Sequence, residues 1–190
     1  MKRVFIITAV RCLIILSALS NQSSAQEFKT GDNVLSLGIG LGSSLGGYSY
    51  SSQTPAISIQ FEHGQWEVGG PGTISLGGYL GFKSFKYEHA YYYSQKWSYT
   101  VIGIRSAYHY NGLKVDHLDV YGGVMLSYNV LNYTFKSDNL LYDNYHGDYP
   151  SAFGFTLYIG GKYYFTNNIA GFLELSNGIS IATIGGSYKF

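Results

Sequence analysis

Apolar residues alternate with small or polar residues along most of the chain after residue 30. The first such stretch, 33–44, reads NVLSLGIGLGSS, in which leucine and isoleucine take every second position. A period of two predicts β-strands with one apolar face. Eight stretches show it, at 33–44, 57–62, 74–83, 102–109, 119–129, 153–163, 169–176 and 179–190. The chain is therefore predicted to be all-β, with an even number of strands.

The links between these stretches alternate in character. Links one, three and five are polar, tyrosine-rich or both: GGYSYSSQT, YEHAYYYSQKW and YTFKSDNLLYDNYHGDYPS. Links two, four and six are more compact, and the turn dipeptides Asn111-Gly112 and Asn177-Gly178 suit tight hairpins. Long loops at one end and short turns at the other are typical of an outer-membrane barrel with both termini in the periplasm. The last link is short where this pattern expects a long one.

The second face of the predicted strands consists mainly of glycine and serine. Such a face would be a poor soluble exterior, because it offers water almost no charge. It suits the inner wall of a narrow eight-stranded barrel, where small side chains relieve crowding. Charged residues make up only 12% of the chain and aromatic residues 17%. We therefore expect an eight-stranded antiparallel up-and-down transmembrane β-barrel with lipid outside, and not a soluble barrel with an apolar interior.

A few larger polar residues share the small-residue face, and both charge signs are present. They predict a plug of ion pairs and water inside the barrel, because an unpaired buried charge would cost several kcal/mol. Arg105 and Glu174 are expected near the middle of the lumen, whereas Glu62 and Lys189 are expected at wet strand ends. The predicted lumen network comprises Glu62, Lys83, Arg105, His109, Asp119, Lys162 and Glu174.

The amino-terminal stretch MKRVFIITAVRCLIILSALSNQSSA predicts a signal peptide over residues 1–25, with the barrel domain over 26–190. The single cysteine, Cys12, lies in this leader, so no disulfide is expected. Removing the leader leaves nine basic residues against eleven acidic ones. This balance, without any basic tract, argues against nucleic-acid binding.

Aromatic residues end the apolar face of several strands, as expected of girdles at the two bilayer interfaces. The predicted girdle residues are Tyr108, Tyr110, Tyr128, Tyr133, Tyr163, Phe165, Tyr188 and Phe190. The ending GGSYKF resembles the carboxy-terminal signal of outer-membrane barrel proteins. The chain is similar to the small eight-stranded class that includes OmpX and the transmembrane domain of OmpA. This resemblance implies that the barrel-insertion machinery reads Tyr188 and Phe190.

The tyrosine-rich links suggest a non-enzymatic structural or surface-interaction role for a monomeric barrel, with lipid around it and a surface protein or glycan as a possible ligand. The residues proposed for contact are Tyr91, Tyr92, Tyr93, Tyr142, Tyr145 and Tyr149. A narrow solute channel is the first alternative.

A lipid-modifying enzyme is the second alternative, but a serine–histidine–acid arrangement is not evident. Ser106 and His109 have opposite strand parity, and His89 and His146 lie in links without a well-placed acid. Asp143, His146 and Asp148 could approach a cation, although a solvated loop is the simpler interpretation. We expect no cofactor, no metal and no catalytic residue.

Overall fold

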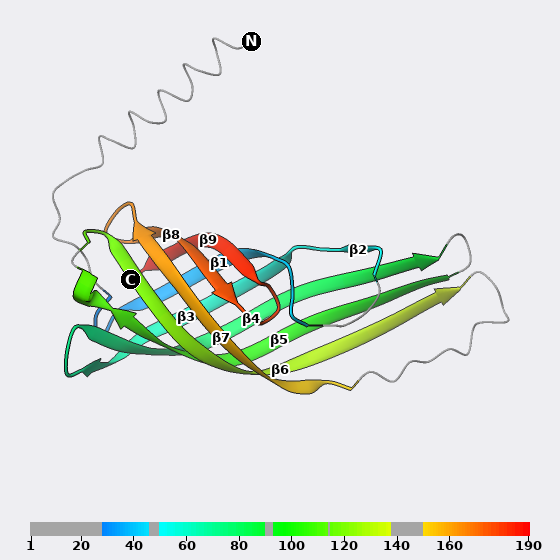
Figure 1. Cartoon of the computed structure of the whole chain (residues 1–190), viewed down its shortest axis with the longest axis horizontal. Coiled ribbons are helices and arrows are strands. Elements are labelled where there is room, and N and C mark those ends of the chain that lie inside the picture. Colours follow the sequence, from blue (N-terminus) through cyan, green and yellow to red (C-terminus); the bar gives the residue numbers. More distant parts are fainter. Residues whose placement is uncertain (1–27, 46–49, 90–92, 114, 138–149) are drawn as a thin grey trace, which may run out of the picture.

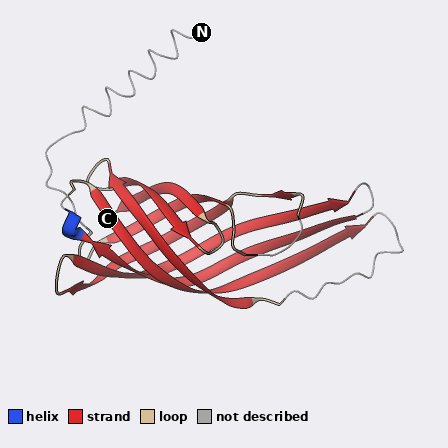
Figure 2. Cartoon of the chain, in the orientation of Figure 1, coloured by secondary structure: helices blue, strands red, loops and turns tan. Residues whose placement is uncertain are grey.

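Eight antiparallel strands form a closed barrel in the computed structural model, which describes residues 28–45, 50–89, 93–113, 115–137 and 150–190. Each strand pairs with its neighbours along the chain, and the first and last strands pair with each other. The barrel strands are β1 (Asn33–Leu41), β3 (Ala56–Val68), β4 (Gly72–His89), β5 (Tyr93–Tyr110), β6 (Leu118–Ser137), β7 (Ala152–Tyr164), β8 (Ile169–Ser176) and β9 (Ala182–Lys189). The predicted fold class is confirmed (Figures 1 and 2).

Two short elements complete the described structure. The 3-10 helix η1 (Asn111–Leu113) lies in the link between β5 and β6. Strand β2 (Ser52–Gln53) pairs with β4 just beyond the end of β3. Pro55 separates β2 from β3, and it has no N–H to donate to the β4 ladder. Strand β2 thus runs along β4 in line with β3, which begins after the two intervening residues Thr54 and Pro55. No helix in the described residues is long and apolar enough to span a membrane.

The barrel has its apolar side chains outside and its polar side chains inside. Ile104 and Leu126 are each 66% exposed, whereas Ser36 is 1% and Arg105 2% exposed. The same alternation holds in the barrel part of all eight strands, as the sequence predicts. An exterior of leucine, isoleucine and phenylalanine is stable only against hydrocarbon, so the strands cross a lipid bilayer.

Three strands are much longer than the others. β4, β5 and β6 have 18, 18 and 20 residues, whereas about 9–11 residues cross a bilayer. Their ends project beyond the barrel as a sheet, at the end opposite the carboxy terminus (Figure 1). The predicted long link YEHAYYYSQKW is therefore wrong, because only residues 90–92 lie between β4 and β5.

The two faces of this projecting sheet exchange polarity. On the outward face, Phe82 is followed two and four residues later by Ser84 and Lys86. On the inward face, Lys83 is followed by Phe85, which is 1% exposed. Beyond Phe82 the strands keep the period of two, but polar residues now point outward and aromatic residues inward. One apolar face was expected throughout, so the sequence predicted a loop here. The exchange also marks where the lipid-facing band ends.

Two further predictions need correction. Tyr133 is not a girdle residue, because it lies on the inward face and its ring packs against Trp97 with centroids 5.7 Å apart. Five residues separate Tyr128 from Tyr133, and an odd spacing reverses the face of a strand. The last strand begins at Ala182 instead of residue 179. Ile179 lies before this strand and is buried inside the barrel with Phe85 and Trp97, at the end from which the sheet projects, which we call the upper end.

Candidate functional site

The barrel interior holds a cluster of four charged side chains. Glu62 on β3 lies between two cations, Arg105 on β5 and Lys162 on β7. The Lys162 ammonium donates directly to Glu62 Oε2, and Arg105 Nη2 lies 3.7 Å from Glu62 Oε1. Arg105 Nη2 also donates to Glu174 Oε2 of β8 at 2.7 Å. Two carboxylates therefore balance two cations in a space from which solvent is almost excluded.

Aromatic side chains hold this cluster in place. Arg105 Nε donates to Tyr158 Oη at 3.2 Å, and the guanidinium carbon lies 4.0 Å from the centre of the same ring. Tyr121 donates its hydroxyl to Glu174 Oε2 at 3.1 Å, and the Lys162 ammonium lies 4.4 Å from its ring centre. Cation–π contacts of this kind are strongest where water is excluded.

His109 and Asp119 form a second polar group. His109 Nδ1 donates to Asp119 at 2.9 Å, and His109 Nε2 lies 3.1 Å from Ser75 Oγ. All three side chains are buried. The sequence placed His109 and Asp119 in the lumen, but it missed Ser75, which looked like one more small wall residue.

The amino-terminal end of the described chain closes the barrel mouth below this group. The Phe28 ring is 0% exposed and stacks on His109, with centroids 3.9 Å apart. Backbone hydrogen bonds join Gly31 N to Gly64 O and Gly64 N to Asp32 O, and Asn111 Nδ2 donates to Phe28 O. The sequence did not predict Phe28 as a lumen residue, because it precedes the first alternating stretch.

Lys83 is separate from the other predicted lumen residues. Its ammonium donates to Gly42 O at 2.5 Å and lies 5.4 Å from the Phe85 ring centre, at the upper end of the barrel. The seven predicted residues therefore form one cluster of four, one pair and one isolated lysine. The expectation of Glu62 at a wet strand end is wrong, because it is 1% exposed. Lys189 is also buried, with its ammonium 3.5 Å from Asp32 Oδ2.

Aromatic and aliphatic side chains fill the upper part of the barrel. Phe85, Trp97, Tyr99 and Ile179 are buried in one core cluster, against which Leu45 packs. Tyr50, in the link that follows β1, lies with its ring centroid 5.2 Å from that of Phe85. Leu45 and Tyr50 therefore pack against the inward face of the projecting sheet.

Most of the tyrosines predicted for surface contact lie outside the described residues: Tyr91, Tyr92, Tyr142, Tyr145 and Tyr149. Tyr93 is described, and it lies within β5, half-buried, with its ring stacked on Phe135 at 5.8 Å. The candidate cation ligands Asp143, His146 and Asp148 also lie outside the described residues. In the part of the chain that is described, no group of three or more metal-ligating side chains comes together.

No protein-family model and no curated protein matches the chain. Solved structures do. The attachment invasion locus protein Ail of Yersinia pestis, in complex with the heparin analogue sucrose octasulfate, aligns with a TM-score of 0.54 and 10% identity, covering 85% of this chain and 99% of Ail. The outer membrane protein OprG of Pseudomonas aeruginosa aligns with a TM-score of 0.51 and 13% identity, covering 86% of this chain and 98% of OprG.

The fold is that of the small outer-membrane β-barrels. At these identities the likeness extends to the fold and not to a binding site or an activity. The carboxy-terminal residues suit this fold, because Tyr188 and Phe190 point outward, 51% and 61% exposed, with their rings stacked at 6.1 Å.

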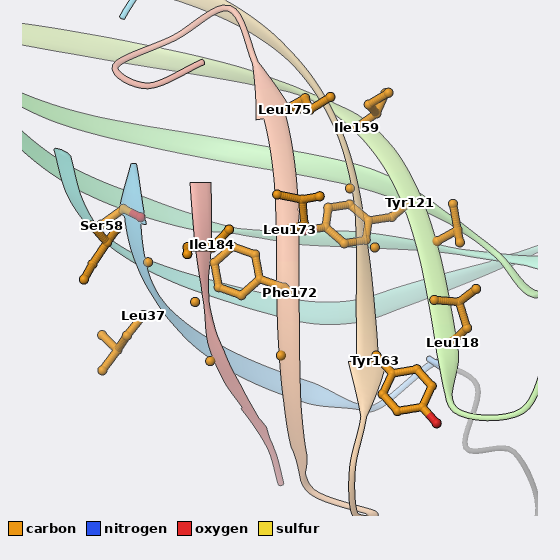
Figure 3. Close-up of a pocket in the computed structure, with 18 of the residues that line it drawn as sticks. Leu37, Ser58, Leu118, Tyr121, Ile159, Tyr163, Phe172, Leu173, Leu175 and Ile184 are labelled. Atoms are coloured by element: carbon orange, nitrogen blue, oxygen red, sulfur yellow. The ribbon is translucent and has the colours of Figure 1, made fainter. Parts of the chain in front are cut away.

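An apolar hollow of about 1,060 Å³ lies on the exterior of this outer-membrane barrel fold (Figure 3). Outward side chains such as Leu37, Ile159, Leu173 and Ile184 line it, with glycines between them. Its lining matches the hydrocarbon chains that surround a membrane barrel, and it offers almost no polar group to orient a ligand. The hollow is therefore part of the lipid-facing surface.

Proposed function

We propose that this protein is an integral outer-membrane barrel with a closed lumen, which acts without catalysis as a structural or interaction protein at the cell surface. The predicted signal peptide and the outward Tyr188 and Phe190 support export and insertion by the barrel-insertion machinery. In this proposal the carboxy terminus and Phe28 face the periplasm, and the projecting sheet faces the exterior. Short turns between strands at the first end and longer strands at the other support this orientation.

The filled interior is the observation that carries the proposal of a closed lumen. Phe28 occupies the lower mouth, the cluster around Arg105 occupies the middle, and Phe85 and Trp97 occupy the upper part. Eight strands leave room only for side chains. Solutes would have to displace paired charges or packed rings to pass.

Conductance in a planar bilayer tests the closed lumen against the channel alternative. We expect the folded wild-type protein to show no conductance above the leak of the bilayer. The triple variant Phe28→Ala/Trp97→Ala/Arg105→Ala removes the lower ring, the central guanidinium and a ring of the upper cluster, so it should give discrete ion currents. Steady, size-selective currents from the wild type would replace this proposal with a narrow channel.

The group formed by Ser75, His109 and Asp119 has the hydrogen-bond order of a catalytic triad, yet its burial favours a structural role. Ser75 is 1% exposed, and Phe28 covers His109 directly. A nucleophile needs space for a substrate carbonyl and for donors to its developing oxyanion. Here protein side chains occupy that space, which supports a non-enzymatic barrel.

The projecting sheet supports the surface role. β4, β5 and β6 continue well beyond the length that crosses a bilayer, and their inner face is packed with aromatic rings. Packing of this kind makes the projection a stiff platform instead of a set of mobile loops. The proposal makes the outward face of this platform available to partners at the membrane surface.

A further inference from the structure

The outward face of the projecting sheet carries a basic groove. The groove has a volume of about 420 Å³ and is lined by Ser52, Gln53, Thr54, Ser84, Lys86, Ser94, Lys96, Thr134 and Lys136. Three ammonium groups and several hydroxyls thus border one surface depression. We call this the lysine groove.

The strand register places the three lysines together. Lys86 on β4 lies directly opposite Lys96 on β5, and Lys96 lies opposite Thr134 on β6. Lys136 is two residues beyond Thr134 on the same face. Like charges directly opposite each other in a sheet are destabilising when nothing lies between them. An anion bound between the lysines would remove this cost.

The charge balance of this outward face is positive. Above Phe82 and Thr100, the described strands β4, β5 and β6 carry three lysines and one carboxylate, Glu88. Glu88 pairs with Lys86, and both side chains remain about half exposed. Lys96 and Lys136 are exposed as well. The groove is therefore built to attract anions from its surroundings.

Its position relative to the lipid-facing band indicates where the anion comes from. Lys86 follows Phe82, the last outward apolar residue of β4, by four residues, or about 13 Å along a strand. A tilted strand reduces this height, and a lysine side chain can bend back toward the membrane surface. Lys96 lies level with Lys86, whereas Lys136 lies level with Glu88, about 20 Å along the strands from Phe82. Strand tilt and side-chain bending bring the Lys86 and Lys96 ammonium groups toward the lipid headgroups, and phosphates that project from the headgroup layer reach Lys136.

We propose that the lysine groove binds the phosphate groups of a phosphorylated lipid headgroup in the leaflet beside the projecting sheet. Lys86, Lys96 and Lys136 supply the charge, and hydroxyls such as Ser94 and Thr134 donate further hydrogen bonds to phosphate oxygens. The inference rests on the proposed orientation of the barrel in the membrane. It adds a specific contact that anchors the projecting sheet to the surface from which it rises.

The test uses the full mature chain folded in a maltoside detergent, which contains no phosphate. Native mass spectrometry measures the affinity for diphosphoryl lipid A and for its monophosphoryl form. We expect tighter binding of the diphosphoryl lipid. The triple variant Lys86→Gln/Lys96→Gln/Lys136→Gln should lose on the order of 100-fold in affinity, and each single variant roughly fivefold. Removing the competing carboxylate by Glu88→Gln should increase the affinity.

Lys29→Gln serves as the matched control, because it removes one exposed positive charge at the opposite end of the barrel. It should bind the lipid as the wild type does. The heat-dependent gel shift of each variant reports folding. Conductance of the wild type tests the closed lumen independently of lipid binding. Failure of this inference is therefore distinguishable from failure of the proposed function. If the triple variant does not fold, the proposal is tested by the three single variants, each of which should lose roughly fivefold in lipid affinity. Wild-type affinity in all three would overturn it.

Inositol hexakisphosphate distinguishes a lipid from a soluble polyanion, because it has phosphates without acyl chains. The proposal expects it to bind more weakly than diphosphoryl lipid A. Equal lipid affinity in the wild type and the triple variant would overturn the proposal. Tight binding of inositol hexakisphosphate without binding of lipid A would also overturn it, in favour of a soluble ligand.

Discussion

Replacing Glu62 with alanine should lower the free energy of unfolding by about 3–5 kcal/mol, the usual cost of removing one partner from a buried ion pair. The substitution leaves the Lys162 ammonium without its carboxylate and leaves Arg105 with Glu174 alone. Two buried cations then share one carboxylate. Urea unfolding in lipid vesicles, followed by the gel shift of the folded barrel, measures the change.

Two further variants separate charge from packing. Glu67→Ala removes an exposed carboxylate near the end of the same strand, so it should change stability by less than about 0.5 kcal/mol. The double variant Glu62→Leu/Lys162→Met removes both partners and keeps their volume, so it should be more stable than Glu62→Ala. If Glu62→Ala unfolds like the wild type, the charged cluster does not stabilise the barrel.

Replacing Leu126 with arginine should destabilise the membrane-inserted barrel by about 2–4 kcal/mol. Leu126 is 66% exposed on the outward face of β6, in the middle of the apolar band, so its replacement would place a charge in hydrocarbon. Refolding titrations in phosphatidylcholine vesicles measure the difference from the wild type.

Asn132→Arg is the matched control for this substitution. Asn132 lies on the same face of β6, six residues further along the strand and beyond the end of the apolar band. Its replacement should cost no more than about 1 kcal/mol. Equal effects at positions 126 and 132 would mean that the outward face of β6 does not pass from lipid to water between them.

The alternation of apolar and small residues was sufficient to predict the eight strands and the two faces of their membrane-spanning parts. Period two fixes the face of each residue within a strand, which is why Leu126 and Arg105 are on the expected sides. The pattern predicted that Arg105 and Glu174 lie in the lumen, but it did not predict which residues they contact. Residues 69 apart in the chain meet across the barrel only through its stagger, which no single strand specifies.

Three features could not be predicted for identifiable physical reasons. Phe28 precedes the strands, so no periodicity marks it as the residue that covers His109. The upper halves of β4, β5 and β6 keep the period of two but exchange polarity, so they resembled loops. Tyr133 was assigned to the wrong face, since its aromatic character outweighed its odd spacing from Tyr128.

A nitroxide scan along β6 tests the central claim, that lipid surrounds the barrel and polar side chains fill it. The predicted mature chain has no cysteine, so single cysteines at positions 120–136 can each carry a spin label. At even positions 120–130 we predict access for oxygen, which dissolves in lipid. At even positions 132–136 we predict access for a water-soluble nickel chelate, and at odd positions access for neither. Chelate access at Val124 and Leu126 would contradict the account.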